Sequence, residues 1–166
     1  MEKTTLGKLF LKEMEMEEKA TRRCIEKFDA TLKEYKPHDR SMKMGSLVQV
    51  VSEMPLWIAH SLEVGDIDFV TWPRFKWDTT EDLLKFYDEN ISRAKKALEN
   101  AKDEDMEKIF SLKNNDQVLM SLPNWDNISS MINHWVHHRG QLTVYMRLNN
   151  IPVPSIYGPS ADEPNF

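Results

Sequence analysis

The chain has 166 residues, of which 40% are hydrophobic and 30% charged, and its net charge is -5. This length can bury the core of one domain without disulfides, so we expect a single domain over residues 1–166. Acidic and basic residues are interspersed without a basic stripe, which argues against a nucleic-acid-binding protein. The one cysteine, Cys24, fits a reducing compartment.

Membrane insertion and secretion are not expected either. No apolar run approaches the ~20 residues that span a bilayer. The stretch MEKTTLGKLFLKEMEMEEKA at the start of the chain lacks the unbroken apolar segment of a signal peptide. The sequence therefore predicts a cytoplasmic protein that makes no membrane contact.

Two long helices are predicted first. Residues 5–35 carry apolar side chains at a spacing of three and four, and Pro37 would end that helix. Residues 41–64 carry a broad apolar face, and Gly65 would end this second helix. Pro55 lies inside it, where a kink or a break is expected. The expected buried residues are Leu9, Met16, Ala20, Cys24, Phe28 and Leu32 in the first helix, and Leu47, Val50, Val51, Met54, Trp57, Ile58 and Leu62 in the second.

An aromatic-rich segment and a third helix follow. Residues 66–78 are irregular in pattern and predict a loop packed over one end of a bundle. Residues 79–102 predict a helix, in which Thr79 is the N-cap and Asp82 completes a variant of the capping box. The expected inner face of this helix consists of Leu83, Phe86, Ile91, Ala94 and Leu98.

The rest of the chain predicts a hairpin, a helix and a tail. Residues 107–123 have short apolar runs on both sides of KNND, which indicates a small β-hairpin. The last helix starts after Pro123, with Asn124 or Asp126 as its cap, and runs to residues 149–150. The proline-rich tail should be extended. Four amphipathic helices predict an all-α fold, a four-helix bundle with a short β-hairpin before the last helix.

The stretch NHWVHHRGQL, residues 133–142, holds three of the five histidines. At about 100° per residue, His134 and His138 lie on one helix face with Gln141 and Tyr145, bordered by Met131 and Leu142. Because that face also carries apolar residues, we expect both histidines to face inward toward the second helix near Val50. Such an i,i+4 pair can place two imidazoles on one divalent metal at about 2.1 Å. With only two protein ligands the site would be weak and completed by water. Spacing alone favours a hydrogen-bonded or partly exposed histidine pair, because H-x-x-x-H is a weak pattern.

Three further residues have structural interpretations. Arg139 lies about 140° from His134, so we expect it to be a structural charge at a helix crossing or an interface. Gly140 would let another helix approach closely. Cys24 lies on the apolar stripe of the first helix, which is typical of a small core residue.

Two stretches resemble the DinB-like family of four-helix-bundle proteins. One is HWVHHRGQLTVYMRLNNIPVPSIYGPSADE at the end of the chain, and the other is YKPHDRSMKMGSLVQVVSEMPLW, residues 35–57. The resemblance implies a bundle that often binds nickel or zinc through three histidines. It also implies frequent dimers. Family members with known activity include thiol-dependent S-transferases and a mycothiol-dependent maleylpyruvate isomerase.

The family pattern implies a ligand set that this chain matches only in part. Two ligands come from H-x-x-x-H, which here are His134 and His138, and the third comes from the second helix a few residues before its proline. That position holds Val50, which cannot bind a metal. Glu53, one helical turn on, is the candidate third ligand, although a surface glutamate is the default for this residue type. Neither His38, before the helix, nor His60, beyond the proline, is expected to replace the missing histidine.

Two functions from different classes remain open. The first is a thiol S-transferase or related enzyme that depends on a divalent metal, nickel or zinc, at a degenerate site. Its substrate would be a small-molecule thiol, with His137 or Tyr145 in proton transfer and Gln141 orienting a ligand. The second is a non-catalytic, metal-free module that binds a small ligand or a partner. No catalytic residue is assigned. We expect a homodimer, from the resemblance and from the aromatic residues of the 66–78 loop, whose alternative role is to cover the bundle.

Overall fold

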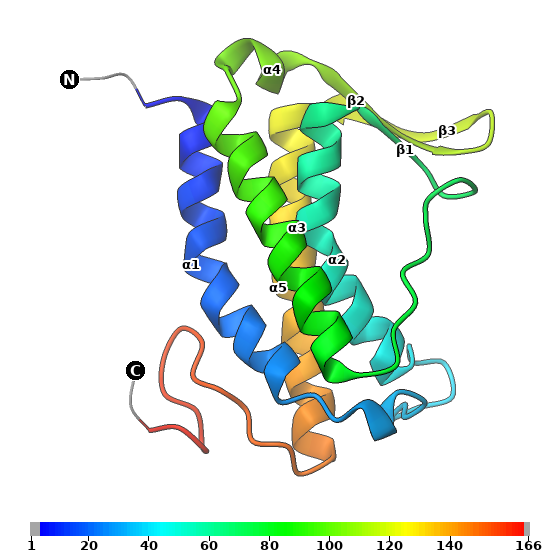
Figure 1. The fold of residues 1–166 in the computed structure, drawn as a ribbon, viewed down its shortest axis with the longest axis vertical. Helices are drawn as coiled ribbons and strands as arrows, with labels where there is room; N and C mark the ends of the chain where they lie inside the picture. The colour runs from blue at the N-terminus through cyan, green and yellow to red at the C-terminus, as the bar shows by residue number, and fades with distance from the viewer. Residues whose placement is uncertain (1–3, 165–166) are drawn as a thin grey trace.

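The computed structural model describes residues 4–164, and four long helices dominate it. They are α1 (Leu6–Glu26), α2 (Met44–Glu63), α3 (Thr80–Asn100) and α5 (Asn124–Leu148). Helix α2 packs against α3 and α5, and α1 packs against the same two helices from the other side (Figure 1). A small three-stranded sheet lies at one end of the bundle. The predicted all-α four-helix bundle is therefore confirmed.

Helix α1 is shorter than the sequence predicts. It ends at Glu26, well before Pro37, and a short 3-10 turn, η1 (Ala30–Leu32), follows. The Asp29 carboxylate accepts a hydrogen bond from the backbone N–H of Thr31 and so caps this turn. Aspartate side chains compete in this way with the helical backbone pattern.

The predicted apolar stripe of α1 was also partly wrong. Leu9 and Met16 are 52% and 72% exposed, respectively. The buried side of the helix contains small and polar residues as well as apolar ones. The spacing of the hydrophobic residues alone therefore does not identify this side. These buried residues are Gly7, Met14, Glu17, Ala20, Thr21, Cys24 and Ile25.

Helix α2 continues through Pro55 as one helix from Met44 to Glu63. The break that the sequence allowed does not occur. Proline cannot donate its backbone nitrogen to the preceding turn, so the packing of α2 in the centre of the bundle must hold the helix together there. The predicted apolar face is borne out: its members are either buried or packed against the core.

The sheet confirms the predicted hairpin and adds a strand. Strands β2 (Ile109–Asn114) and β3 (Gln117–Pro123) pair antiparallel, and the turn between them includes Asn115 with φ 53°. Strand β1 (Asp66–Asp68) pairs with β2 in parallel. The sequence does not predict β1, because three residues carry no period and the pairing joins distant parts of the chain. A short helix, α4 (Asp103–Glu107), precedes β2.

The aromatic loop after β1 runs along the side of the bundle and not over one end of it. In Figure 1 the chain leaves the sheet at one end and descends beside α2 to the start of α3 at the other end. Phe75 and Trp77 pack against the core, while Phe69 is 46% exposed. Most of the aromatic side chains therefore cover the bundle, which weakens their value as an indication of a dimer interface.

The start of α3 agrees with the prediction and that of α5 does not. The Thr79 hydroxyl accepts from the Asp82 N–H, and the Asp82 carboxylate accepts from the Thr79 N–H, which completes the capping box. At α5 neither Asn124 nor Asp126 is the cap. The helix follows Pro123 directly, and the Asn124 amide instead donates to the Asp105 carbonyl oxygen.

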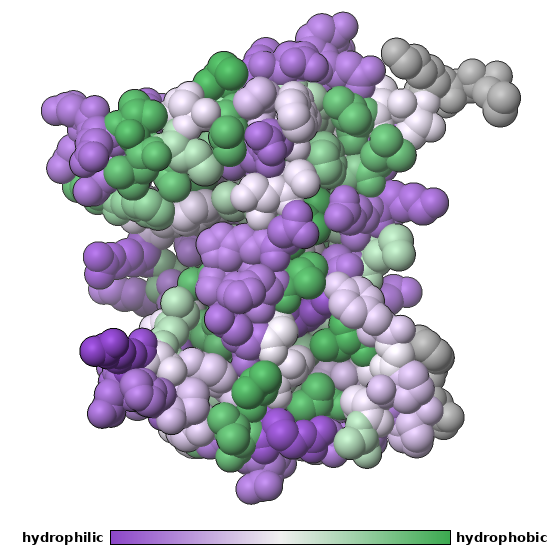
Figure 2. All heavy atoms as spheres, turned by 180° about the vertical axis from the view of Figure 1, so that it is seen from behind, coloured by the Kyte–Doolittle hydropathy of each residue, from purple (hydrophilic) through white to green (hydrophobic). Residues whose placement is uncertain are grey.

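The tail after α5 is extended, as predicted, and folds back beside α1. Glu163 holds it there through ion pairs with Arg23 and Lys27, and its carboxylate also accepts from the Ser155 N–H. Figure 2 shows the opposite side of the molecule, where a polar band separates apolar surface at the two ends. Within residues 4–164, no helix is long and apolar enough to cross a membrane.

Candidate functional site

Helix α5 brings His134 and His138 into direct contact. Residues four apart lie one turn apart on the same face. The two Nε2 atoms are 2.6 Å apart, and the ring centroids are 4.5 Å apart at an interplanar angle of 41°. At this separation the two nitrogen atoms share a hydrogen bond, as the spacing alone favoured, and a metal would have to replace that bond.

Gln141 fixes the orientation of one ring. The His138 Nδ1 atom lies 2.8 Å from Gln141 Oε1. An amide oxygen can only accept, so Nδ1 of the neutral ring carries the proton, and Nε2 then accepts the hydrogen bond that His134 Nε2–H donates. Hydrogen bonds of this kind commonly orient metal-binding histidines.

The pair lies at the edge of the bundle. His134 is exposed and His138 is half-buried, while Trp135 and Leu142 on the same helix are fully buried. The expectation that both imidazoles face inward toward α2 near Val50 is therefore wrong for His134, and a ligand can reach this ring from solvent. Partial burial, together with the nearby His138 and His137, lowers the pKa of His134 below its usual value. The neutral, metal-binding form of that ring is thus favoured near neutral pH.

The second helix supplies no third ligand to this pair. Val50 is half-buried and packs against the core, and its side chain has no donor atom. Glu53 is buried rather than on the surface, and its Oε1 accepts a hydrogen bond of 2.9 Å from Trp72 Nε1. Among residues 4–164, no three His, Cys, Asp or Glu side chains form a group that could hold a metal ion.

The donor atoms fit a divalent ion held by two imidazoles, and they do not fit the three-histidine site that the family pattern implies. Two nitrogens bound at about 2.1 Å in tetrahedral geometry are about 3.4 Å apart, wider than the 2.6 Å between the two Nε2 atoms. A small rotation of the rings would open that distance. The remaining coordination positions would belong to water or substrate.

The other histidines and the cysteine have structural surroundings. His38 is exposed, and its Nδ1 accepts from the Arg40 N–H. His60 stands edge-on to Trp72, with centroids 5.0 Å apart. Cys24 is fully buried, and burial raises the pKa of its thiol to about 11. A thiol with that pKa is a poor nucleophile at neutral pH, so its role as a small core residue is supported.

Arg139, next to His138, belongs to a buried polar network between α1, α5 and the tail. Its Nη1 donates to Glu17 Oε2 at 2.6 Å and to Thr21 Oγ1 at 3.1 Å. Its Nη2 donates to the Tyr157 hydroxyl, which in turn donates to Glu17 Oε2. The prediction of a structural charge at a helix crossing is confirmed. Nothing in the sequence identifies Glu17 as its partner, because the two are 122 residues apart.

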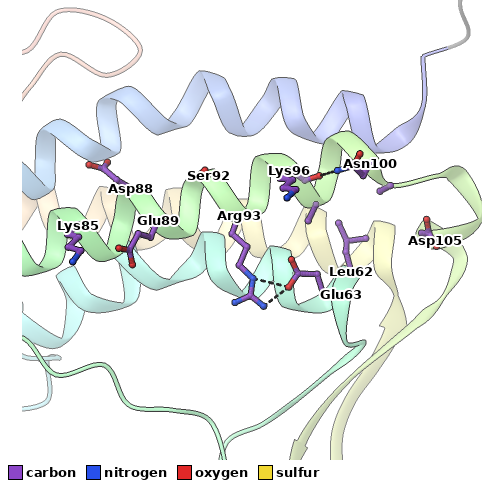
Figure 3. A pocket seen from close by; sticks show the side chains of 12 residues that line it. Leu62, Glu63, Lys85, Asp88, Glu89, Ser92, Arg93, Lys96, Asn100 and Asp105 are labelled. Atoms are coloured by element: carbon purple, nitrogen blue, oxygen red, sulfur yellow. Dashed lines mark hydrogen bonds and ion pairs between the residues drawn. The ribbon is translucent and has the colours of Figure 1, made fainter.

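Another groove lies on the outer side of α3, toward α2 and α4. It has a volume of about 1070 Å³, and Figure 3 shows its side chains spread along the helix surface. Several of its charges already have partners: Arg93 pairs with Glu63, Asp88 with Arg22, and Asp105 with Lys108. Charges that neutralise one another do not converge on a ligand, so this groove is a weaker candidate than the histidine pair.

Known proteins support the assignment of the fold. Two solved structures resemble this one. The first is a DinB-like protein (YjoA) from Bacillus subtilis, with a TM-score of 0.68 and 20% identity, covering 88% of this chain and 96% of that chain. The second is a DinB-like protein from Bacillus cereus, with a TM-score of 0.69 and 21% identity, covering 89% of this chain and 95% of that chain.

Sequence comparison extends the likeness to a family. The uncharacterized protein YrdA of Bacillus subtilis is 48% identical over 42 residues, a match that spans only 25% of this chain and 25% of that protein. The model of the DinB family matches residues 1–165. The chain therefore belongs to the DinB family.

Proposed function

We propose that this DinB-family protein binds a divalent metal, nickel or zinc, through His134 and His138, and that it is a metal-dependent thiol S-transferase. The convergence of the two Nε2 atoms at 2.6 Å carries this proposal. The Gln141 hydrogen bond supports it, because it places the His138 proton on Nδ1 and directs the Nε2 lone pair toward His134, where a metal would take the place of the shared hydrogen bond. The family resemblance suggests the reaction class.

The chain's own residues have defined parts in this function. A bound divalent metal would lower the pKa of a thiol at the open positions and so supply a nucleophile near neutral pH. Gln141 orients His138. The exposed His137 ring lies edge-on to His138, with centroids 5.3 Å apart, and is the candidate for proton transfer. Tyr145 is buried and donates its hydroxyl to the Met42 carbonyl, so it is not free for that role.

Metal binding is tested by calorimetric titration of tag-free protein with zinc and nickel. We expect one weak site in the wild type, which His134→Ala and His138→Ala each abolish. His38→Ala is the matched control, because it removes an exposed histidine of the loop before α2 and should leave the titration unchanged. Identical binding by His134→Ala and the wild type would overturn the proposed site.

The reaction class is tested separately by the loss of free thiol. Protein loaded with zinc or nickel is mixed with cysteine or glutathione and an aromatic electrophile. We expect consumption of the thiol that requires metal and is lost in His134→Ala. Metal binding without any such activity would reject the transferase assignment and leave the metal site in place.

A second candidate is a metal-free module that binds a small ligand or a partner. Val50 favours it, because the position that should supply a third imidazole has no donor atom. The Trp72 hydrogen bond to Glu53 favours it as well, because the nearest carboxylate candidate is already engaged. Absence of binding at millimolar zinc and nickel would select this function over the first.

The proposal includes a homodimer, which rests on the family resemblance. Phe69 and Val70 in the aromatic loop are the exposed apolar residues that such a contact could cover. Light scattering at micromolar concentration tests the assembly. A monomer mass would count against dimerisation without bearing on the metal site.

A further inference from the structure

A second, separate cavity lies between α2, α3 and the aromatic loop. Its volume is about 400 Å³, which suits a small molecule. Glu53 and Leu56 come from α2, Phe86 from α3, and residues 73–76 from the loop. No residue of α5 lines it, so it is distinct from the histidine pair.

Glu53 is the buried acidic group of this cavity. Its side chain lies on the cavity wall, and the residue is only 9% exposed. Within the part of the chain that the structure describes, the Trp72 indole is its one hydrogen-bond partner, and that bond uses Oε1. Oε2 is left available to a ligand. Burial raises the pKa of this carboxyl, although the Trp72 bond works in the opposite direction.

Two ring contacts hold Trp72, the hydrogen-bond donor to Glu53. The Trp72 ring packs edge-on against Trp57, with centroids 5.6 Å apart, and against His60 at 5.0 Å. A buried carboxylate held by one neutral donor lacks a cation that would offset its desolvation. A ligand ammonium group would supply that missing charge.

The walls of the cavity are apolar and its remaining charges are positive. Phe75 and Phe86 stack face to face, with centroids 3.8 Å apart and planes 6° apart, and Leu56 lines the cavity beside them. Arg74 and Lys76 also line it and are exposed. Neither forms an ion pair with any carboxylate among residues 4–164. The cavity therefore combines one buried negative group, an apolar middle and two free positive groups.

We propose that this cavity binds a small zwitterion with an apolar body, such as an aromatic or aliphatic amino acid. Its ammonium group meets Glu53, its carboxylate meets Arg74 and Lys76, and its hydrocarbon part lies against Leu56 and the stacked rings. A ligand with only an ammonium group would leave the two exposed cations without a partner and would be repelled by them. A ligand with only a carboxylate would leave Glu53 uncompensated.

Binding is measured by the tryptophan fluorescence of the protein, because Trp72 donates a hydrogen bond to Glu53. The probes are phenylalanine, phenethylamine and 3-phenylpropanoate, which share one ring and differ in their charges. We expect phenylalanine to bind at least about tenfold more tightly than either of the others. Trp72→Phe serves to assign the signal, and calorimetry confirms binding in that variant.

Two variants test the role of each charge. Glu53→Gln keeps an oxygen that can accept from Trp72 and removes the negative charge, so the fold is retained. We expect it to weaken phenylalanine binding at least about tenfold, and Arg74→Gln/Lys76→Gln to do the same. Glu89→Gln, at an exposed glutamate of α3, is the matched control and should change nothing.

Three outcomes would overturn the proposal: no binding of phenylalanine at millimolar concentration, equal binding of phenylalanine and phenethylamine, or unchanged binding in Glu53→Gln. The metal titrations of wild type and Glu53→Gln should coincide. Failure of this proposal is therefore distinguishable from failure of the proposed metal site.

Discussion

Two adjacent residues of α5, His138 and Arg139, lie in opposite surroundings. Arg139 is 1% exposed, and its guanidinium has partners on α1 and on the tail. His138 is half-buried beside the exposed His134, and the Nε2 atoms of the two rings are hydrogen-bonded to each other. A buried charge without ionic or hydrogen-bond partners destabilises the fold. An exposed pair of side chains has no such requirement and can bind a ligand.

The two faces of α5 differ in whether their polar side chains have partners on other elements. The face that bears Arg139 is closed, because Glu17, Thr21 and Tyr157 satisfy the guanidinium. The face that bears His134 and His138 is open to solvent, and in the proposed function it binds the metal. Mutations on the first face should therefore change stability, and mutations on the second should change binding.

The largest expected effect is on the closed face. Arg139→Met leaves the Glu17 carboxylate buried without its cation, so we expect a loss of about 3–5 kcal/mol in the free energy of unfolding. Urea denaturation measures it. The double variant Glu17→Met/Arg139→Met removes both charges and should recover much of that loss. A double variant as unstable as the single one would contradict the account of this face.

The next effect concerns metal binding at the face that bears His134 and His138. Val50→His adds a third imidazole at the position that the family pattern assigns to a ligand. Without metal, the polar ring in a half-buried position should destabilise the protein by about 1–3 kcal/mol. With zinc or nickel, the melting midpoint of the variant should rise far more than that of the wild type, because metal bound to the native state adds to its stability.

The metal-induced melting shifts of Val50→His and the wild type together show whether Val50 occupies the position of the missing ligand. Equal metal-induced shifts in both proteins would mean that Val50 is not the lost ligand position or that Glu53 already fills it. Glu53→Gln in the same experiment separates these two explanations. The metal-induced rise of the melting midpoint should shrink in this variant only if the Glu53 carboxylate binds the metal.

A smaller effect concerns pH and Glu53. Its pKa is raised in the folded state above the ordinary value of 4.5, so the native protein binds this proton more tightly than the unfolded chain does. Stability is therefore lost as the pH rises from about 4.5 through the folded pKa, and the loss persists at neutral pH. Glu53→Gln should melt above the wild type at neutral pH, and the difference should vanish below about pH 4. A difference independent of pH would contradict burial as the cause.

The smallest effect concerns Gly140, which the sequence suggested as a point of close helix approach. A Cβ atom there would meet nothing within 4 Å among the described residues, so within one chain that suggestion was wrong. Gly140→Ala should stabilise the helix by about 1 kcal/mol, measured by thermal melting. Destabilisation that depends on protein concentration would instead place a second copy of the chain against this helix.

Whether a feature of the fold could be predicted from the sequence depends on how many residues separate the interacting partners. The Thr79 capping box and the hairpin at Asn115 were predictable because their partners lie within a few residues. The end of α1 was missed because no glycine or proline marks it; the chain leaves the helix after Glu26, and Thr31 then donates to Asp29 in the 3-10 turn. Strand β1 was missed because its partner lies more than 40 residues away.

The site follows the same rule. The contact between His134 and His138 was predictable from helical spacing, since it stays within one turn. The pairs Glu53–Trp72 and Arg139–Glu17 were not, because they join different elements whose approach no local pattern encodes. The cavity beside Glu53 was missed for this reason: its residues acquire a shared environment only after α2, α3 and the loop have packed.

X-ray absorption spectroscopy of the zinc-loaded, tag-free wild type tests the central claim most directly, because it counts the imidazoles bound to the metal. The account predicts two imidazoles, from His134 and His138, with oxygen ligands in the remaining positions, and three imidazoles in Val50→His. A wild-type spectrum without imidazole ligands, or one unchanged in His134→Ala/His138→Ala, would contradict it.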